Sequence, residues 1–368
     1  MSKIGILSMQ RIINYGSFLQ AFALKSMLES LGHSVEFVDY HPGKTLSPAA
    51  GKFQKACKIL KLNAPLSQRI QYLNFKRGFA EKYHSSLGLD AAPNYTPKLD
   101  LLIIGSDEVF NCTQSNPNVG YAPELFGKDN RADKVITYAA SFGNTTPDKL
   151  DEYDKTPEIA SLLNKLDAVS VRDENSRSII RKMTGKDPVL HPDPVLLYDY
   201  MKNCDLPPVD TPEDYLLLYA YPGRLTKSES EWVRDYARAR NLKIYTAGGV
   251  QRYADRFLDC SPFELLSYFM NAREVITDTF HGTIFSVITK RPFATIIRPS
   301  AGGSYGNEEK LSDLLRRLDL MDRGVLSVTE IPGVMEREID HSRTEQLIAA
   351  GRRSAEEYLL KEVGRGAS

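Results

Sequence analysis

The stretch KIGILSMQRIINYGSFLQAFALKSMLESLGHSVEFVDY, residues 3–40, carries the pattern that decides the fold. Its opening KIGILS (3–8) is typical of a buried strand, and its end VEFVDY (35–40) of a second strand. Between them, apolar residues recur at helical spacing over 17–31, and Gly32 follows as a helix stop. A strand, a helix and a strand in this order predict a βαβ unit with parallel strands.

The same alternation continues beyond this unit. Further strands are predicted at LLIIG (101–105), VITYAA (135–140) and AVSVR (168–172). A polar stretch with several prolines, 199–214, interrupts the pattern, which resumes with YLLLYAY (215–221). Because 368 residues exceed the usual size of one core, we predict an α/β protein of two domains, 1–200 and 215–340. A last helix at 341–363 can cross back to the first domain.

The second half repeats the α/β pattern of the first. Its predicted helices cover about 226–240, 262–271, a segment from about 282, and 307–318, and its later strands are KIYTA, EVITD (274–278) and FATII (293–297). Since parallel strands connected by helices form a sheet covered on both faces, each half is expected to be a separate layered domain.

The composition is that of an ordinary globular protein, with 42% hydrophobic and 26% charged residues. The 47 basic side chains balance 47 acidic ones, which argues against nucleic acid as a general partner. The four cysteines lie far apart and lack metal-site spacing, so they are interpreted as reduced thiols. We find no hydrophobic run long enough for a signal peptide or a membrane span, which predicts a cytoplasmic protein.

One segment, 51–85, departs from the neutral average and is predicted as a helical insertion in the first domain. Its basic residues are Lys52, Lys55, Lys58, Lys61, Arg69, Lys76, Arg77 and Lys82, with the single acid Glu81 and interleaved apolar side chains. A basic amphipathic helix of this kind can lie on the anionic inner face of a membrane or meet a pyrophosphate-linked acceptor. The simpler alternative is a solvated helix face.

Candidate ligand-binding residues follow two strands of the first half. Ligands of open α/β sheets bind at the carboxyl ends of strands, where helix N-termini present amides to anions. The polar and glycine residues at these ends are Asn14, Gly16, Gly105, Ser106 and Asp107. For Asp107 the alternative is a simple helix cap.

Two further strand ends carry ionisable groups. Arg172 ends the strand 168–172, where a guanidinium suits bidentate binding of a carboxylate or phosphate, although a surface ion pair with Asp173 is the alternative. ITDTFHGTIFS (276–286) places His281 at a turn from strand to helix, with small polar neighbours. These neighbours are Thr279, Gly282 and Thr283. A histidine at such a turn favours a ligand role over a packed core role.

In order and spacing, six motifs resemble the polysaccharide pyruvyl transferases. They are NYGSFLQAFALKSMLESLGHSVEFVDY, LLIIGSDEVFN, TYAASFG, SVRDENS, HPDPVLL and ITDTFHGTIFSVITKRPFATII, and the resemblance runs from residue 3 to about 320. It implies two Rossmann-like domains that face a cleft, similar to the B-type glycosyltransferases. It also implies transfer of the pyruvyl group of phosphoenolpyruvate to a sugar hydroxyl pair as a ketal, in surface polysaccharide biosynthesis, without a metal or cofactor.

The resemblance implies roles for individual residues. His281 matches a histidine associated with the donor, and Arg172 matches a strand-end arginine, whereas an arginine that some members carry two positions before the histidine is Thr279 here. Arg291 and Arg298 are candidates to replace it. On this hypothesis His281 is the general acid or a phosphate ligand, and Asp107 is a candidate base. The donor-binding set is Arg172, Ser106, Gly105, Thr279, Gly282, Thr283, Asn14 and Gly16.

Two alternatives stay open from the sequence. A glycosyltransferase that uses a nucleotide sugar would employ the same two-domain cleft, and Asp39 at the end of the second strand keeps ribose binding possible. A non-catalytic carbohydrate-binding relative is favoured by Thr279 in place of an arginine. The acceptor is expected to be a saccharide, which a lipid carries if the segment 51–85 meets a membrane.

Overall fold

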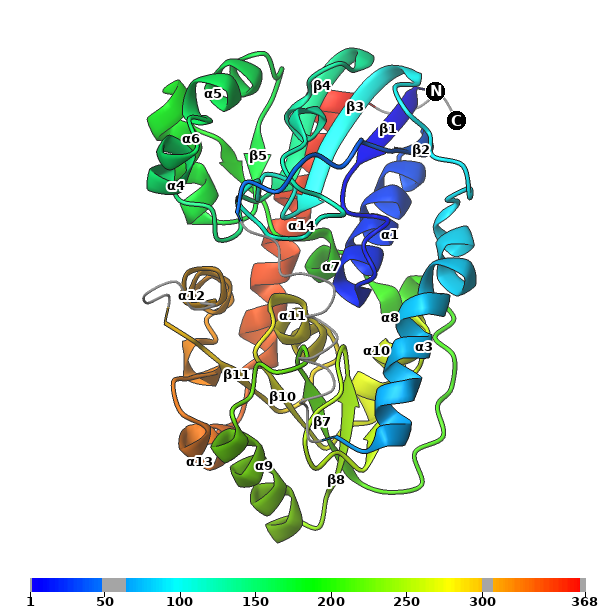
Figure 1. Ribbon diagram of the computed structural model, residues 1–368, viewed down its shortest axis with the longest axis vertical. Coiled ribbons are helices and arrows are strands. Elements are labelled where there is room, and N and C mark those ends of the chain that lie inside the picture. Colours follow the sequence, from blue (N-terminus) through cyan, green and yellow to red (C-terminus); the bar gives the residue numbers. More distant parts are fainter. Residues whose placement is uncertain (1, 48–63, 300–306, 365–368) are drawn as a thin grey trace.

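Two parallel sheets organise the chain, and the computed structural model describes residues 2–47, 64–299 and 307–364 of it (Figure 1). The first sheet has six strands in the order β2-β1-β3-β4-β5-β6, and the second has six in the order β12-β11-β10-β7-β8-β9. All described strand pairs are parallel. The predicted α/β class with two Rossmann-like domains is confirmed.

The strands of the first sheet are β1 (Lys3–Leu7), β2 (Ser34–Val38), β3 (Lys98–Asp107), β4 (Arg131–Ala140), β5 (Ser170–Val171) and β6 (Val189–Leu190). Those of the second are β7 (Tyr215–Tyr219), β8 (Lys243–Ala247), β9 (Arg256–Phe257), β10 (Glu274–Thr277), β11 (Phe293–Ile296) and β12 (Gly324–Val325). The central strands of the second sheet, β7, β10 and β11, are fully buried, as expected for parallel strands covered on both faces.

The helices of the first half are α1 (Tyr15–Ser30), α3 (Leu66–Tyr83), α4 (Pro147–Glu152), α5 (Thr156–Asn164), α6 (Glu174–Thr184), α7 (Pro194–Leu197) and α8 (Tyr200–Asn203). Those of the second are α9 (Lys227–Ala239), α10 (Pro262–Asn271), α11 (Phe280–Ile288), α12 (Glu308–Arg317), α13 (Ile331–Met335) and α14 (His341–Val363). Short 3-10 turns lie at His84–Leu87, Pro123–Phe126, Met321–Arg323 and Val328–Glu330.

Each sheet reverses its winding direction once. The first sheet starts at β1 and adds β2 on one side and β3 to β6 on the other; the second starts at β7, with β8 and β9 on one side and β10 to β12 on the other. The crevice outside the carboxyl ends of the strands at such a switch point is where α/β sheets bind ligands. The loops after β1, β3, β7 and β10 are therefore the ones that position a site.

Side-chain caps fix where the helices of these loops begin. The Asn14 side chain accepts a hydrogen bond from the Gly16 amide at 2.8 Å, so α1 begins two residues before the predicted start. The Thr279 hydroxyl accepts from the Gly282 amide at 2.9 Å and starts α11 in the same way. Both helices thus direct their N-terminal ends at the carboxyl edge of their own sheet.

The third strand corrects one expectation. β3 continues through Asp107, which has a positive φ of 77°, and the next helical element in the described chain is the 3-10 turn at Pro123–Phe126. Ser106 and Asp107 are therefore strand residues, and the alternative of a helix cap at Asp107 is wrong. The predicted strand 168–172 is also shorter, because the backbone of Ala168 forms only an isolated bridge with Ile136.

The two domains pack directly on each other. Phe22 of α1 meets Phe263 of α10 edge to face, with ring centroids 5.0 Å apart. The last helix, α14, runs from the second domain to the first, where the Tyr358 hydroxyl donates to the Thr137 carbonyl at 2.9 Å and Glu362 pairs with Lys134 at 2.8 Å (Figure 1). These contacts hold the two carboxyl edges opposite each other.

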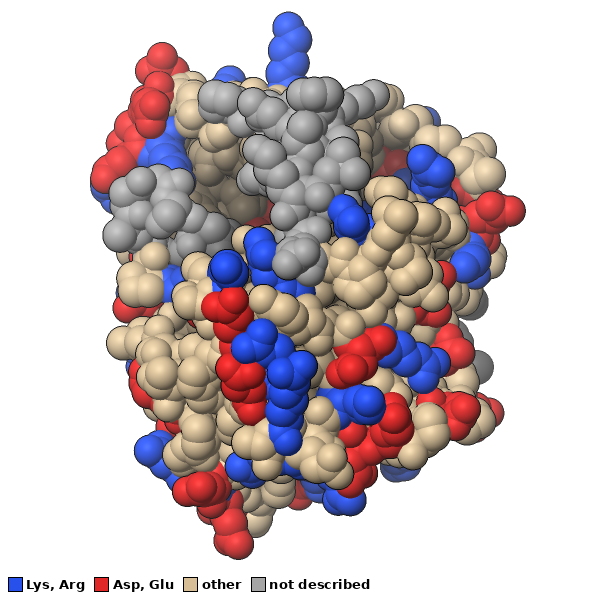
Figure 2. All heavy atoms as spheres, turned by 60° about the horizontal axis from the view of Figure 1, so that its bottom comes forward, with Lys and Arg blue, Asp and Glu red and all other residues tan. Residues whose placement is uncertain are grey.

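Helix α3 covers part of the basic segment, whose residues 51–63 lie outside the described chain. Tyr72, Phe75 and Phe79 are buried, and Phe75 packs on Phe257 with centroids 6.2 Å apart. Most of the interleaved aromatic residues thus belong to the core. Among the described residues, no helix has the length and apolar content that crossing a bilayer requires. On the face shown in Figure 2, basic and acidic side chains alternate.

Candidate active site

A cavity of about 540 Å³ lies where the two switch points face each other. It is lined from the first domain by Met9, Ile12, Asn14, Ser17, Asp107, Glu108, Asn111, Thr113, Gln114, Ser115, Asn116, Val119, Asn144, Lys149 and Arg172. From the second domain it is lined by Tyr221, Arg224, Thr279, Phe280, His281 and Lys310. The loops after β1, β3, β7 and β10 all contribute, so the cavity occupies the position that the topology predicts for a ligand.

His281 lies in the first turn of α11 and is 8% exposed. Its imidazole packs against the first turn of α1 across the domain boundary, and a side chain at Gly16 would overlap the ring. The Nε2 atom is 3.5 Å from Oδ2 of Asp193. The absence of a side chain at Gly16 is therefore what allows the histidine of one domain to reach the helix start of the other.

Arg172 follows β5 and is buried in an ion-pair network. Its Nη1 donates to Asp193 Oδ2 at 2.8 Å and to Asp107 Oδ1 at 3.5 Å. The guanidinium carbon is 4.3 Å from the ring centroid of Phe280. Burial lowers the pKa of Arg172, but the acidic groups Asp193 and Asp107 outweigh it and raise the pKa on balance. The arginine is thus a fixed, permanent cation at the base of the cavity.

Asp193 joins the two predicted donor ligands, although the sequence assigned it no role. It caps α7 by accepting from the Val195 amide at 3.0 Å, and its other oxygen meets Arg172 and His281. Burial alone would raise the pKa of Asp193. The neighbouring His281 and Arg172 lower it by more, so that the pKa falls to about 2. The Asp-Pro pair in HPDPVLL is a local signal for a helix cap, whereas the long-range contacts leave no signal in the sequence.

Two acidic residues at the end of β3, Asp107 and the following Glu108, face the cavity. Oδ2 of Asp107 accepts from the Ser17 hydroxyl at 2.6 Å. Glu108 pairs across the cleft with Lys310 of α12 at 3.0 Å. Burial raises the pKa of Glu108, but Lys310 and Arg172 bring it down to about 2. One carboxylate is therefore oriented by the first domain, and the other connects the domains.

The structure places four predicted residues behind the cavity wall. The Ser106 hydroxyl donates to Gln20 at 2.7 Å, the Thr283 hydroxyl donates to the Thr279 carbonyl at 3.0 Å, and both side chains are fully buried. Gly105 has a φ of 121° and lies so close to the Tyr138 carbonyl that a side chain would overlap it. The Gly282 amide is already bonded to Thr279. Asn14, Thr279, Arg172, Asp107 and His281 are brought together at the wall.

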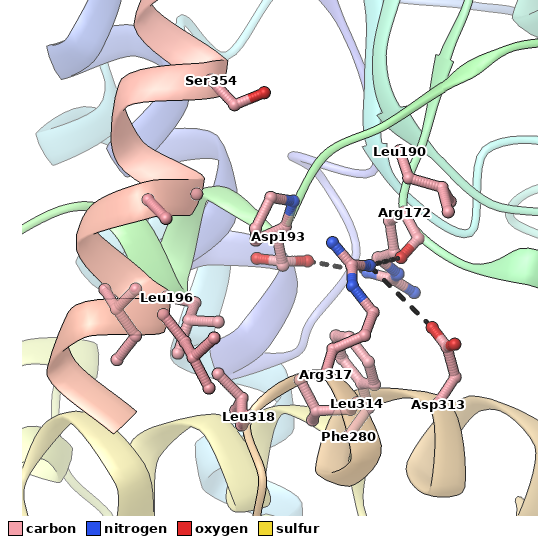
Figure 3. A pocket seen from close by; sticks show the side chains of 15 residues that line it. Arg172, Leu190, Asp193, Leu196, Phe280, Asp313, Leu314, Arg317, Leu318 and Ser354 are labelled. Atoms are coloured by element: carbon pink, nitrogen blue, oxygen red, sulfur yellow. Dashed lines mark hydrogen bonds and ion pairs between the residues drawn. The ribbon is translucent and has the colours of Figure 1, made fainter. Parts of the chain in front are cut away.

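A smaller cavity of about 230 Å³ lies behind Arg172 and Phe280, between α12 and α14 (Figure 3). Nη1 of Arg317 on α12 donates to the Arg172 carbonyl at 2.8 Å. Asp313 pairs with Arg317 at 3.9 Å. Arg172 is thus held through its side chain by Asp193 of the first domain and through its main chain by Arg317 of the second.

One part of the main cavity is lined by charged side chains and another part by uncharged polar ones. Its cationic lining residues Lys149, Arg172, Arg224 and Lys310 face the acidic residues Asp107 and Glu108. The wall from 111 to 116 and Asn144 carries amides and hydroxyls instead. In the part of the chain that the structure describes, no group of His, Cys, Asp and Glu side chains is arranged to hold a metal ion. The excess of cations suits an anionic ligand beside a polar, uncharged one.

Known structures share this two-domain architecture. A putative UDP-N-acetylglucosamine 2-epimerase from Listeria monocytogenes is 12% identical, with a TM-score of 0.54 and coverage of 100% of this chain and 98% of that one. The UDP-GlcNAc 2-epimerase from Neisseria meningitidis bound to UDP-GlcNAc is 9% identical, with a TM-score of 0.48 and coverage of 98% and 99%. The spinosyn forosaminyltransferase SpnP is 13% identical, with a TM-score of 0.43 and coverage of 97% and 95%. The first of these likenesses, with a TM-score above 0.5, shows that the chain shares the two-domain fold of that epimerase.

The sequence itself is more specific than the fold. The family model of the polysaccharide pyruvyl transferases matches residues 14–299. This range includes the cavity loops except the beginning of the loop after β1 and the residues of α12. The chain therefore belongs to the polysaccharide pyruvyl transferase family and is a transferase. No curated protein matches it.

Proposed function

We propose that the protein transfers the pyruvyl group of phosphoenolpyruvate to two hydroxyls of a saccharide and forms a cyclic ketal. An acid protonates the methylene carbon, and a sugar hydroxyl attacks the adjacent carbon and loses its proton to a base. The second hydroxyl then attacks the same carbon and loses its proton, and inorganic phosphate leaves. The products are the ketal and phosphate, so no oxidant, reductant or nucleotide is needed.

The meeting of His281 and Arg172 on the carboxylate of Asp193 is the observation that carries this proposal. The buried carboxylate of Asp193, 3.5 Å from Nε2, orients the imidazole at the cavity, which suits a general acid or a phosphate ligand. The buried guanidinium of Arg172 suits the carboxylate or phosphate of the donor. Asp107, oriented by Ser17, is the candidate base for the attacking hydroxyl.

The uncharged wall of the cavity suits the acceptor. Amide and hydroxyl side chains both donate and accept hydrogen bonds, as sugar hydroxyls require. Internal contacts orient this wall: the Asn111 amide donates to Glu108 at 2.8 Å, and the Thr145 hydroxyl donates to Asn111 at 3.0 Å. A saccharide bound here would place its hydroxyls between this wall and the ionic base of the cavity.

The structure gives less support to a nucleotide-sugar glycosyltransferase or a non-catalytic relative than to the pyruvyl transfer proposed above. Asp39 is paired with Arg11 and accepts from the Asn94 amide at 2.8 Å, and it does not line the cavity. Its carboxylate is thus committed elsewhere rather than offered to a ribose. The Thr279 hydroxyl is committed to the α11 cap, so the cation missing at this position must come from another element if the donor needs one.

The outer face of α3 suits a lipid-linked form of the acceptor. Leu66, Ile70 and Leu73 are 64%, 50% and 39% exposed along one stripe with Arg77. We expect cosedimentation with phosphatidylglycerol vesicles that falls in an Ile70→Ser, Leu73→Ser variant. Equal sedimentation of this variant and the wild type would remove the membrane contact and leave the transferase proposal intact.

The test of the function is a reaction with phosphoenolpyruvate and a panel of glycosides and lipid-linked saccharides. We expect phosphate release that depends on an acceptor, together with a ketal methyl signal in the proton spectrum of the product. Consumption of a nucleotide sugar with phosphoenolpyruvate untouched would replace this function by glycosyl transfer.

A further inference from the structure

A second guanidinium, which sequence reasoning did not single out, lines the second-domain side of the cavity. Arg224 follows β7, and its guanidinium carbon is 4.5 Å from the ring centroid of Tyr221. Its Nη1 is 3.6 Å from Oδ1 of Asp278. The Arg224 side chain is 21% exposed, against 3% for Arg172. Arg224 thus contacts Tyr221 and Asp278 and is still partly accessible from the cavity.

Asp278 is the anchor of this arginine. It directly follows β10, is fully buried, and accepts no hydrogen bond from the described residues through either carboxylate oxygen. A buried carboxylate without hydrogen bonds is rare and needs charge compensation. Arg298 lies 3.7 Å from it but also pairs with Glu229 at 3.0 Å. Arg224 therefore supplies much of the compensation, and its guanidinium is drawn to the strand end beside α11.

The position of Arg224 complements that of Arg172. Arg172 is fixed in the first domain by Asp193, whereas Arg224 belongs to the second. The Asn14 amide donates to the Tyr221 hydroxyl at 2.5 Å, which connects the ring under Arg224 to the start of α1. A donor with a carboxylate and a phosphate has two anionic ends, and two guanidiniums from facing domains suit such a molecule.

We propose that Arg224 is the second-domain contact of the anionic donor and that Asp278 is the residue that positions it. This inference rests on the proposed function in one respect only, namely that the donor is phosphoenolpyruvate. A contact from each domain would make donor binding depend on both halves of the cleft.

The first experiment is calorimetric titration with phosphoenolpyruvate. We expect Arg224→Gln to weaken binding about 10- to 100-fold, because charge-assisted hydrogen bonds are lost. Arg224→Lys keeps the charge without the fork and is expected to lie between this variant and the wild type. Arg273→Gln is the matched control, because Arg273 pairs with Asp214 at 3.0 Å and does not line the cavity. Affinity of Arg224→Gln within about twofold of wild type would overturn the proposal.

The same variants separate this inference from the proposed function. If the wild type binds a nucleotide sugar and not phosphoenolpyruvate, the function fails, and the titrations are repeated with that nucleotide. Weaker nucleotide binding by Arg224→Gln alone would then support the anion contact, and unchanged binding would overturn it. A wild type that binds neither anion overturns both.

The role of Asp278 is tested by whether its replacement weakens or tightens the binding of phosphoenolpyruvate. Removal of a negative charge near an anion site should tighten binding if the charge acts only through space. We expect Asp278→Asn to weaken phosphoenolpyruvate binding about three- to tenfold, because Arg224 loses its anchor. Equal or tighter binding would contradict a positioning role. If this variant does not fold, Tyr221→Leu removes the other support and should weaken binding by a similar factor, with Tyr221→Phe as its control.

Discussion

The two domains hold their cations in the cavity in different ways. In the first domain, Arg172 is almost entirely buried, bonded to Asp193 and approached by Asp107. In the second, Arg224 lies on an aromatic ring, is partly exposed, and meets its carboxylate at ion-pair distance only. The first arrangement is closely hydrogen-bonded, whereas the second rests on a ring contact and a longer ion pair. From this difference we infer that the first half orients the donor and the second completes its binding.

The largest expected effect is on the group that connects the halves. We expect His281→Gln to lower kcat about 10²- to 10⁴-fold, which is the usual contribution of a general acid. His341→Gln, at the start of α14 and outside the cavity, is the control. Steady-state phosphate release measures both variants. Full activity of His281→Gln would remove the histidine from the mechanism.

Loss of the shared carboxylate tests how rigid the first half is. We expect Asp193→Asn to lower the free energy of unfolding by about 3–5 kcal/mol, because a buried partner is removed from Arg172. Asp187→Asn breaks exposed ion pairs with Arg177 and Arg181 instead and should cost much less, because solvent screens exposed pairs. Urea unfolding followed by circular dichroism compares them. Equal costs would mean that the buried network does not stabilise the fold.

The contact between the halves is tested at Gly16. We expect Gly16→Ala to lower kcat about 10²-fold, because the added methyl displaces the His281 ring. Gly333→Ala is the control, since a side chain there meets open space. Activity assays and thermal unfolding are measured together. A Gly16→Ala variant that is as active as wild type would show that the imidazole position is not critical.

The smallest expected effect concerns the ion pair across the cleft. The folded pKa of Glu108, about 2, lies below its ordinary value of 4.5, so its stabilising contribution is complete above about pH 4.5 and is lost as the pH falls towards 2. We expect this contribution to be about 2 kcal/mol, reduced by the partial exposure of the side chain. Wild type should therefore lose more stability than Glu108→Gln between pH 5 and about pH 3. Parallel losses would show that the pair with Lys310 contributes nothing.

The sequence predicted the fold and part of the site because both depend on local patterns. Strand ends, caps and glycine turns placed Asn14, Arg172, Thr279 and His281 at the carboxyl edges of sheets, where the structure has them. It misplaced the side chain of Ser106, because the chain continues as a strand where a helix start was expected.

The residues that the sequence missed depend on contacts between distant segments. Asp193 meets Arg172 across 21 positions and His281 across the domain boundary, so no spacing within a motif reveals it. Arg224 lies in a loop with no pattern of its own and gains its place from Asp278 and Tyr221. Such pairings become visible only when the chain is folded and, for Asp193 and His281, when the two domains are packed together.

The measurement that tests the central claim most directly is calorimetric titration of the wild type and of His281→Ala with phosphoenolpyruvate, beside a panel of nucleotide sugars. The account predicts that phosphoenolpyruvate binds the wild type, that nucleotide sugars do not, and that His281→Ala binds phosphoenolpyruvate at least about tenfold more weakly. Binding of a nucleotide sugar without binding of phosphoenolpyruvate would contradict it.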